Sequence, residues 1–136
     1  MSLPKPVPTP VGLNAEFYEH CREGRLSFQQ CGSCEIFRHP PRVLCPSCGS
    51  ATWAWVASSG HGRLHTWTVI HQHPHPGFAD DLPLAVVVVE LDEGVRLVSG
   101  IRGLAPSDLV EGMPLVVGYE QRSPEITLPV FHRAQD

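Results

Sequence analysis

Four cysteines stand in two close pairs whose spacing suits metal binding. Cys31 and Cys34 form the first pair, Cys45 and Cys48 form the second, and ten residues separate the pairs. Each C-x-x-C turn brings two thiolates to one ion, so two turns complete the tetrahedral four-sulfur shell that zinc prefers. The sequence therefore predicts one zinc ion. A rubredoxin-like iron site with the same ligands and a pair of disulfides are the alternatives.

A closed shell of four thiolates leaves no open position for water or substrate. We therefore expect the metal to be structural, stabilising a segment too small to form its own hydrophobic core. The fifth cysteine, Cys21, lies outside the two pairs, on the apolar face of a predicted helix. A small buried hydrophobic residue is the simpler interpretation of Cys21, and a reactive thiol is the alternative.

Three histidines alternate at His71, His73 and His75. Period-two spacing can place three imidazoles on one side of an extended segment, where they could bind a second metal. The alternative is a polar loop between two strands, which Pro74 and Pro76 favour. The sequence shows no nucleophile elbow and no phosphate-binding glycine loop, so we predict no catalytic residues.

A possible ligand-binding face lies along residues 63–71. Alternation places Leu64 and the residues in phase with it inside a barrel, and Arg63, His65 and Trp67 on the opposite face. An indole ring can stack on adenine, and an arginine can bind phosphate, so we predict these three residues as ligand-binding. The alternative is that Trp67 is an ordinary core residue covered by the N-terminal helix.

The elements that must position these residues are mostly strands. Residues 1–12, rich in proline, predict a flexible arm, and residues 13–27 predict a helix with Asn14 as its N-cap. Residues 28–52 form the predicted ribbon, which Trp53 and Trp55 would seal against the barrel. Residues 53–136 contain strand candidates and a hairpin turn at 92–94. The sequence predicts a mainly β protein, with a five-stranded OB-fold barrel; another small barrel or a sandwich is the alternative.

Composition and charge limit the partners. The chain has 136 residues, 10 Lys+Arg against 14 Asp+Glu, and its only lysine is Lys5. Proteins that bind nucleic acids usually present clustered basic residues, which makes nucleic acid an unlikely partner here. No run approaches the roughly 20 apolar residues of a membrane helix, and the N-terminus lacks an apolar secretory core, so we expect a cytoplasmic protein.

The order of these features resembles a known family. A helix, the four-cysteine ribbon, Gly60-x-Gly62 before a strand, Pro83 before an aliphatic strand, a Leu91-Asp92-Glu93-Gly94 turn and Gly112-Met113 follow one another over residues 13–131. This order resembles the family of unknown function number thirty-five, which joins a rubredoxin-like zinc ribbon to an OB-fold. The resemblance implies an accessory protein that works beside a thiolase-like or related acyl-CoA enzyme, and binding of acyl-CoA itself. Only the four cysteines can be carried over from this resemblance as site residues.

The predicted function is therefore a non-catalytic accessory protein of acyl-CoA metabolism. It would bind acyl-CoA, a thiolase-like partner enzyme, or both, through the OB-fold. A module that binds single-stranded nucleic acid is the alternative, because OB barrels and zinc ribbons often have that role. An independent enzyme is a third hypothesis, which no motif in the sequence favours.

Overall fold

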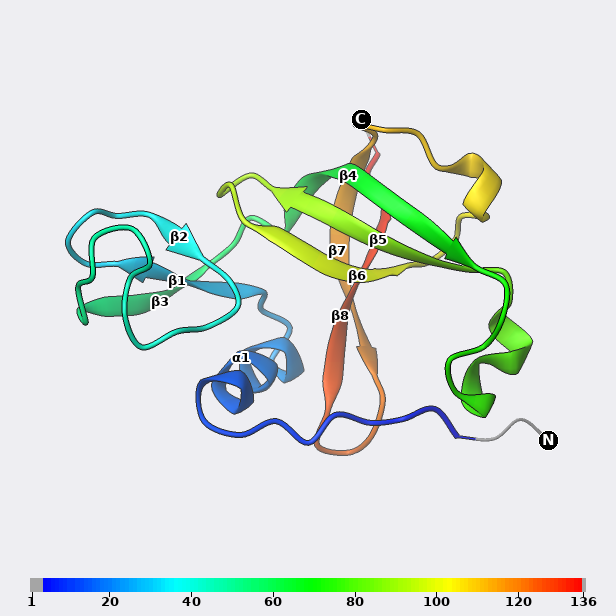
Figure 1. Cartoon of the computed structure of the whole chain (residues 1–136), viewed down its shortest axis with the longest axis horizontal. Coiled ribbons are helices and arrows are strands. Elements are labelled where there is room, and N and C mark those ends of the chain that lie inside the picture. Colours follow the sequence, from blue (N-terminus) through cyan, green and yellow to red (C-terminus); the bar gives the residue numbers. More distant parts are fainter. Residues whose placement is uncertain (1–3, 136) are drawn as a thin grey trace.

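The computed structural model describes residues 4–135, so residues 1–3 of the predicted arm and residue 136 lie outside the described residues. The elements form a three-stranded sheet and a closed five-stranded barrel, with one helix below them (Figure 1). The predicted fold class is confirmed. In chain order the elements are α1 (Leu13–Arg22), β1 (Ser27–Cys31), β2 (Phe37–Arg38), β3 (Trp53–Ala57), β4 (His61–Ile70), η1 (Pro76–Asp81), β5 (Leu84–Leu91), β6 (Arg96–Ile101), η2 (Pro106–Asp108), β7 (Pro114–Gln121) and β8 (Thr127–Arg133).

Helix α1 is shorter than the predicted segment 13–27. Gly12 is its N-cap, so the prediction of Asn14 at that position is wrong, and the helix ends at Arg22. Gly24 has a φ of 77°, a left-handed conformation that turns the chain away from the helix and into β1. Phe17 and Cys21, four residues apart, are the buried residues of α1. The interpretation of Cys21 as a small buried residue is confirmed, since its exposed fraction is 0%.

Strand β3 belongs to the ribbon, where it pairs antiparallel with β1 from Ser27↔Ala57 to Cys31↔Trp53. The predicted barrel range of residues 53–136 therefore begins too early, because Trp53–Ala57 pairs within the ribbon. The physical reason is that no residue of β3 is fully buried, as one face of a barrel strand must be. Trp55 packs against α1 rather than the barrel: its Nε1 donates to Glu16 Oε1 at 3.1 Å.

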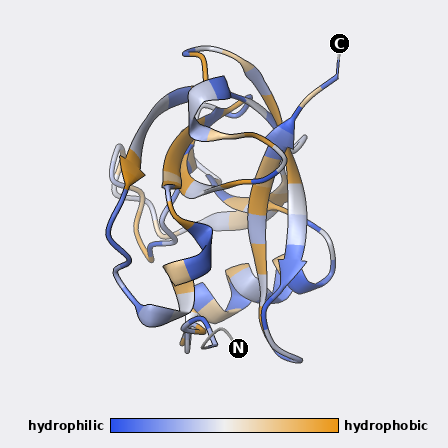
Figure 2. Cartoon of the chain, turned by 90° about the vertical axis from the view of Figure 1, so that its right-hand side faces the viewer, coloured by the Kyte–Doolittle hydropathy of each residue, from blue (hydrophilic) through white to orange (hydrophobic). Residues whose placement is uncertain are grey.

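The barrel closes in the order β4-β5-β6-β8-β7, and β6 and β8 pair in parallel through only two residues on each strand. Alternate residues of β5 point inward, and Figure 2 shows hydrophobic residues gathered along these strands. Fully burying one such side chain contributes about 1.5–3 kcal/mol. The barrel core includes Leu64, Val87, Val89, Leu91, Leu97, Leu115 and Phe131. The described residues contain no helix that is long and apolar enough to cross a bilayer.

A β-bulge in β4 changes which residues face the core. The pairing of β4 with β5 shifts between Leu64 and Thr66. Leu64 points inward as predicted, but Thr66 and Thr68 are exposed, and the half-buried Trp67 packs against the core. Our assignment of faces is therefore wrong beyond Leu64, because one extra residue in a strand reverses the orientation of every later side chain.

Candidate functional site

The four cysteines of the ribbon converge on one point. All four Sγ atoms lie within 4.8 Å of one another, and the Cys31–Cys48 and Cys34–Cys45 pairs are each 3.6 Å apart. Sulfurs about 2.3 Å from a tetrahedral zinc ion would be roughly 3.8 Å apart, so the donor set fits one such ion. All five cysteines of the chain are free, which leaves these four available as thiolate ligands.

Backbone amides around the first cysteine favour its ionised form. The N–H groups of Cys34 and Ser33 both donate to Cys31 Sγ, at 3.4 Å each, and they lower the pKa of Cys31 to about 6. Gly32 allows this turn to pack closely, because a Cβ there would lie 2.7 Å from a carbon of Thr52. The first turn thus stabilises the negative charge on Cys31 that metal binding requires.

A buried glutamine supports the ribbon beside the cysteines. Gln29 is fully buried; its Oε1 accepts from Arg38 Nε at 2.9 Å and from the Arg42 backbone N–H at 2.7 Å. Its Nε2 donates to the Arg42 carbonyl at 2.9 Å. Gln29 therefore ties β1 to the loop that leads to the second cysteine pair. Sequence reasoning missed this residue, since no spacing motif marks it.

The histidine segment does not form a cluster of ligands in the structure. Within residues 4–135, the cysteine quartet is the only group of three or more His, Cys, Asp or Glu side chains placed to hold a metal ion. His71 and His73 are exposed, and His75 caps η1 by accepting the Gly77 N–H at 2.9 Å. The predicted polar loop describes this segment better than a second metal site, although the short helical turn η1 at its end was not predicted.

The structure places the predicted ligand-binding residues at the barrel surface. Arg63 is exposed, and its Nη1 donates to the Gly112 carbonyl at 3.0 Å. His65 and Trp67 are half-buried and share a shallow hollow with Glu111. The bulge therefore separates Trp67, which packs against the core, from the exposed Arg63, and the Glu111 carboxylate lies beside His65 and Trp67.

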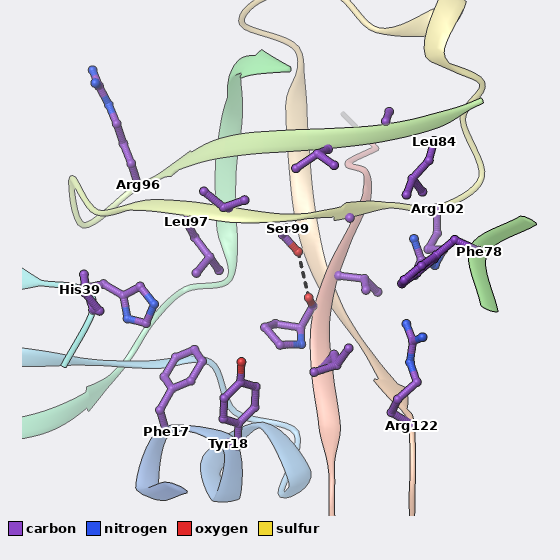
Figure 3. A pocket seen from close by; sticks show the side chains of 18 residues that line it. Phe17, Tyr18, His39, Phe78, Leu84, Arg96, Leu97, Ser99, Arg102 and Arg122 are labelled. Atoms are coloured by element: carbon purple, nitrogen blue, oxygen red, sulfur yellow. Dashed lines mark hydrogen bonds between the residues drawn. The ribbon is translucent and has the colours of Figure 1, made fainter. Parts of the chain in front are cut away.

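A larger pocket lies between the barrel and the helix, and we call it the β6–β8 pocket (Figure 3). Its volume is about 590 Å³, within the roughly 300–1,000 Å³ usual for ligand sites. Phe17 and Tyr18 rise from α1, and Leu97 and Ser99 point toward them from β6. His39 of the ribbon lines the same pocket, so the barrel, the helix and the ribbon all contribute to it.

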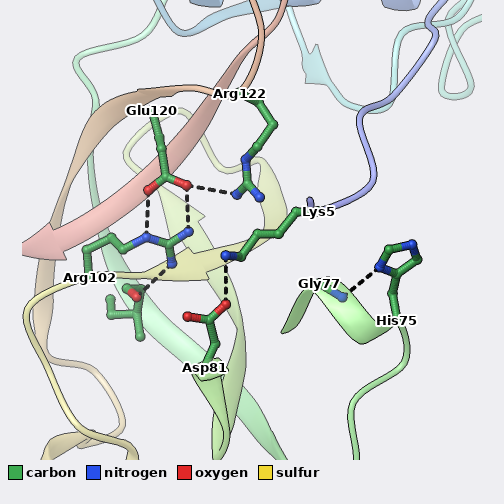
Figure 4. A network of polar contacts seen from close by, with 8 residues as sticks. Lys5, His75, Gly77, Asp81, Arg102, Glu120 and Arg122 are labelled. Atoms are coloured by element: carbon green, nitrogen blue, oxygen red, sulfur yellow. Dashed lines mark hydrogen bonds and ion pairs between the residues drawn. The ribbon is translucent and has the colours of Figure 1, made fainter. Parts of the chain in front are cut away.

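Arg102 and Arg122 lie at the end of the pocket near Phe78, and their charged partners line a neighbouring hollow (Figure 4). Glu120 binds both Nε and Nη2 of Arg102, at 2.8 and 3.0 Å, and it accepts from Arg122 Nη2 at 2.8 Å. The hydrogen bonds from Arg102 lower the pKa of Glu120. Lys5 of the N-terminal segment pairs with Asp81 at 2.9 Å. These contacts join segments that are far apart in the sequence.

A four-thiolate ribbon attached to an OB barrel defines a class of two-part zinc-ribbon and OB-fold proteins. Family models match both parts: "ChsH2, rubredoxin-like zinc ribbon domain" matches residues 19–54, and "ChsH2, C-terminal OB-fold domain" matches residues 55–120. A "DUF35 domain-containing scaffold protein" of Pyrococcus furiosus is 31% identical over 100 residues, which are 73% of this chain and 72% of that protein. The chain belongs to the DUF35 family, and the resemblance seen in the sequence is confirmed.

Two further relatives are similar over nearly the whole chain. A "Probable enoyl-CoA hydratase alpha subunit" of Thermomonospora curvata is 42% identical over 130 residues, 96% of this chain but only 40% of that subunit. A chain of the solved structure "Ltp2-ChsH2(DUF35) aldolase" is 41% identical with a TM-score of 0.85, and the match covers 93% of this chain and 98% of that one. This chain therefore spans about two fifths of the hydratase subunit, but almost all of the chain seen in the aldolase structure.

Proposed function

We propose that this protein is a non-catalytic accessory subunit that binds an acyl-CoA enzyme and helps it to handle its thioester substrate. The observation that carries the proposal is the match to the chain in the Ltp2-ChsH2(DUF35) aldolase structure, which this chain covers almost completely. Relatives described as scaffold proteins and as a hydratase alpha subunit support the same role. The partner would be a thiolase-like enzyme, or an aldolase or hydratase that acts on acyl-CoA.

The ribbon's part in this function is structural, and we propose zinc as its metal. Four thiolates in a tetrahedral arrangement fill the coordination shell, so the ion has no open position for a reacting group. The ion would instead fix the loops 32–36 and 42–50, which carry the cysteines. A fixed ribbon gives the subunit a rigid surface beside the barrel.

Acyl-CoA binding by the barrel is the second part of the proposal. Arg63, His65 and Trp67 remain our candidates for contacts with the nucleotide, because an exposed guanidinium can bind phosphate and an indole edge can pack on adenine. Glu111 beside them would weaken phosphate binding. Arg63 lies outside this hollow, with its Nη1 on the Gly112 carbonyl, and it would supply the attraction for a phosphate.

Two measurements test the function. The chain is co-expressed with the thiolase-like or aldolase protein encoded nearest to it, and the purified complex is weighed by native mass spectrometry. Dodecanoyl-CoA is then titrated by calorimetry into the chain and into the complex. We expect a defined complex and saturable binding. No complex together with no binding would contradict the proposal, and salt-sensitive binding of a single-stranded oligonucleotide would favour the nucleic-acid alternative.

A further inference from the structure

The walls of the β6–β8 pocket are built mainly from apolar side chains. Leu97 of β6, Leu128 and Val130 of β8, and Phe17 of α1 line its length. The pocket exists because β6 and β8 pair only at Gly100↔Val130 and Ile101↔Phe131, so the rest of β6 has no neighbouring strand on that side. Ser99 Oγ, which donates to the Pro129 carbonyl at 2.8 Å, holds the two strands together at the edge of the gap.

Two residues of this pocket carry a buried polar atom without a hydrogen-bond partner. In the described part of the chain, four buried side-chain nitrogens have no hydrogen-bond partner, and two of them belong to pocket residues: Arg122 Nε and His39 Nδ1. Leaving a buried donor unpaired costs about 1–3 kcal/mol, and more for a charged group. An arginine whose side chain is only 12% exposed and whose Nε is unpaired therefore favours a ligand that supplies an acceptor.

Arg102 and Arg122 line this end of the pocket, and the network that continues from them into a neighbouring hollow carries an excess of positive charge. Glu120 is already bound on both oxygens by Arg102, and Asp81 is bound by Lys5. Arg122 shares Glu120 with Arg102, so three cations face two carboxylates among these five side chains. Figure 3 shows Arg122 pointing into the pocket at the same end as Phe78 and Arg102. An electronegative oxygen of a ligand would be attracted to this end.

We infer that the β6–β8 pocket binds the acyl group of the thioester, with Arg122 donating to a carbonyl or carboxylate oxygen on that group. The inference rests on the proposed function and deepens it, because it assigns the apolar half of the ligand to a defined site. The Tyr18 hydroxyl, which points into the pocket toward β6, is a second donor for the same ligand. The pocket would therefore select its ligands by the length of the acyl chain and by an oxygen on that chain. The nucleotide would play no part in this selection.

The test uses the full chain and three probes: dodecanoyl-CoA, dodecanoate and free CoA. Arg122→Gln removes the charge, and Glu120 stays paired with Arg102, so the fold should survive. Arg25→Gln is the matched control, because Arg25 is an exposed arginine that pairs only with Glu23. We expect Arg122→Gln to lower the affinity of the chain for dodecanoyl-CoA and for dodecanoate about tenfold or more. Arg25→Gln should change neither affinity. Tyr18→Phe, which keeps the ring, should weaken both less than Arg122→Gln does.

Methyl NMR locates the ligand independently of the variants. Dodecanoyl-CoA should shift the methyl signals of Leu97, Leu128 and Val130, and free CoA should leave them unchanged. If dodecanoyl-CoA binds with normal affinity to Arg122→Gln and leaves these methyl signals unchanged, the acyl group lies elsewhere. The pocket assignment is then overturned while the accessory function stands. Absence of binding to the chain and to its complex overturns both.

Discussion

The ribbon and the barrel contain the same kinds of strand, but they are stabilised in different ways. The barrel interior is aliphatic and aromatic, with Val87, Val89 and Phe131 all fully buried. In the ribbon, Phe28 is fully buried as well, but so are the polar Gln29 and the sulfur-bearing Cys31. The barrel is therefore held by an aliphatic and aromatic core, whereas the ribbon relies more on buried hydrogen bonds and on the metal that we propose for its four thiolates.

The largest effect should come from removing one metal ligand. Cys45→Ser should abolish stoichiometric zinc and unfold the ribbon, because zinc binding to four-ligand sites contributes about 10–16 kcal/mol in zinc-finger peptides. Metal analysis and circular dichroism measure both consequences. Cys21→Ala is the matched control, since Cys21 is buried but lies outside the quartet, and it should retain one metal per chain. A Cys45→Ser protein that lacks metal but keeps a folded ribbon would show that the ribbon does not depend on the metal.

A core truncation tests the other region. Phe131→Ala should lower the free energy of unfolding by about 3–5 kcal/mol, because it leaves a cavity where a fully buried ring had packed. Urea unfolding, monitored through spectroscopic signals of residues in the barrel, gives this free energy. The same variant should still bind one metal ion. Loss of the metal together with the barrel would show that the two regions are not separately stabilised.

The junction between the regions should be sensitive to acid. His39 of the ribbon packs against Phe17 and Phe28, and burial lowers its pKa to about 4 from 6.5. Because the unfolded chain takes up this proton first, the stabilisation is complete above about pH 6.5 and is lost as the pH falls toward 4. Thermal melts at pH values between these two limits should show stability falling as the pH falls, and His39→Leu should reduce the slope of this dependence. His73→Gln, an exposed change, should leave the slope as it was.

The smallest effect concerns the link between the regions. Glu93 in the β5–β6 turn accepts from Ser58 Oγ at 2.6 Å and from the Ser59 N–H at 3.0 Å, so it holds the segment that follows β3. Glu93→Gln should cost about 1 kcal/mol of unfolding free energy. Glu125→Gln, in the exposed β7–β8 loop, is the control. Equal unfolding curves for both variants would show that this link contributes nothing.

Local patterns predicted the elements well, and contacts between distant segments decided the rest. The cysteine spacing led directly to the quartet, and the aliphatic run in residues 84–91 with the turn at 92–94 led to the β5–β6 hairpin. The pairing of Trp53–Ala57 with β1 depends on a partner strand more than twenty residues away, which no local pattern specifies. One bulged residue in β4 reversed the predicted faces beyond Leu64.

The β6–β8 pocket could not have been predicted for a similar reason. Its walls come from α1, the ribbon and four separate parts of the barrel, and its key residue, Arg122, stands alone in the sequence between β7 and β8. A single arginine in a loop has no periodicity and no motif. Only the fold shows that it is nearly buried and shares Glu120 with Arg102.

Hydrogen–deuterium exchange before and after removal of the metal shows whether the ribbon depends on the ion while the barrel does not. The zinc-loaded chain is treated with a chelator, and exchange is followed by mass spectrometry on peptides from residues 27–57 and from residues 84–101. We predict that the ribbon peptides lose their protection while the barrel peptides keep theirs. Unchanged protection in the ribbon, or equal loss in both sets of peptides, would contradict the account.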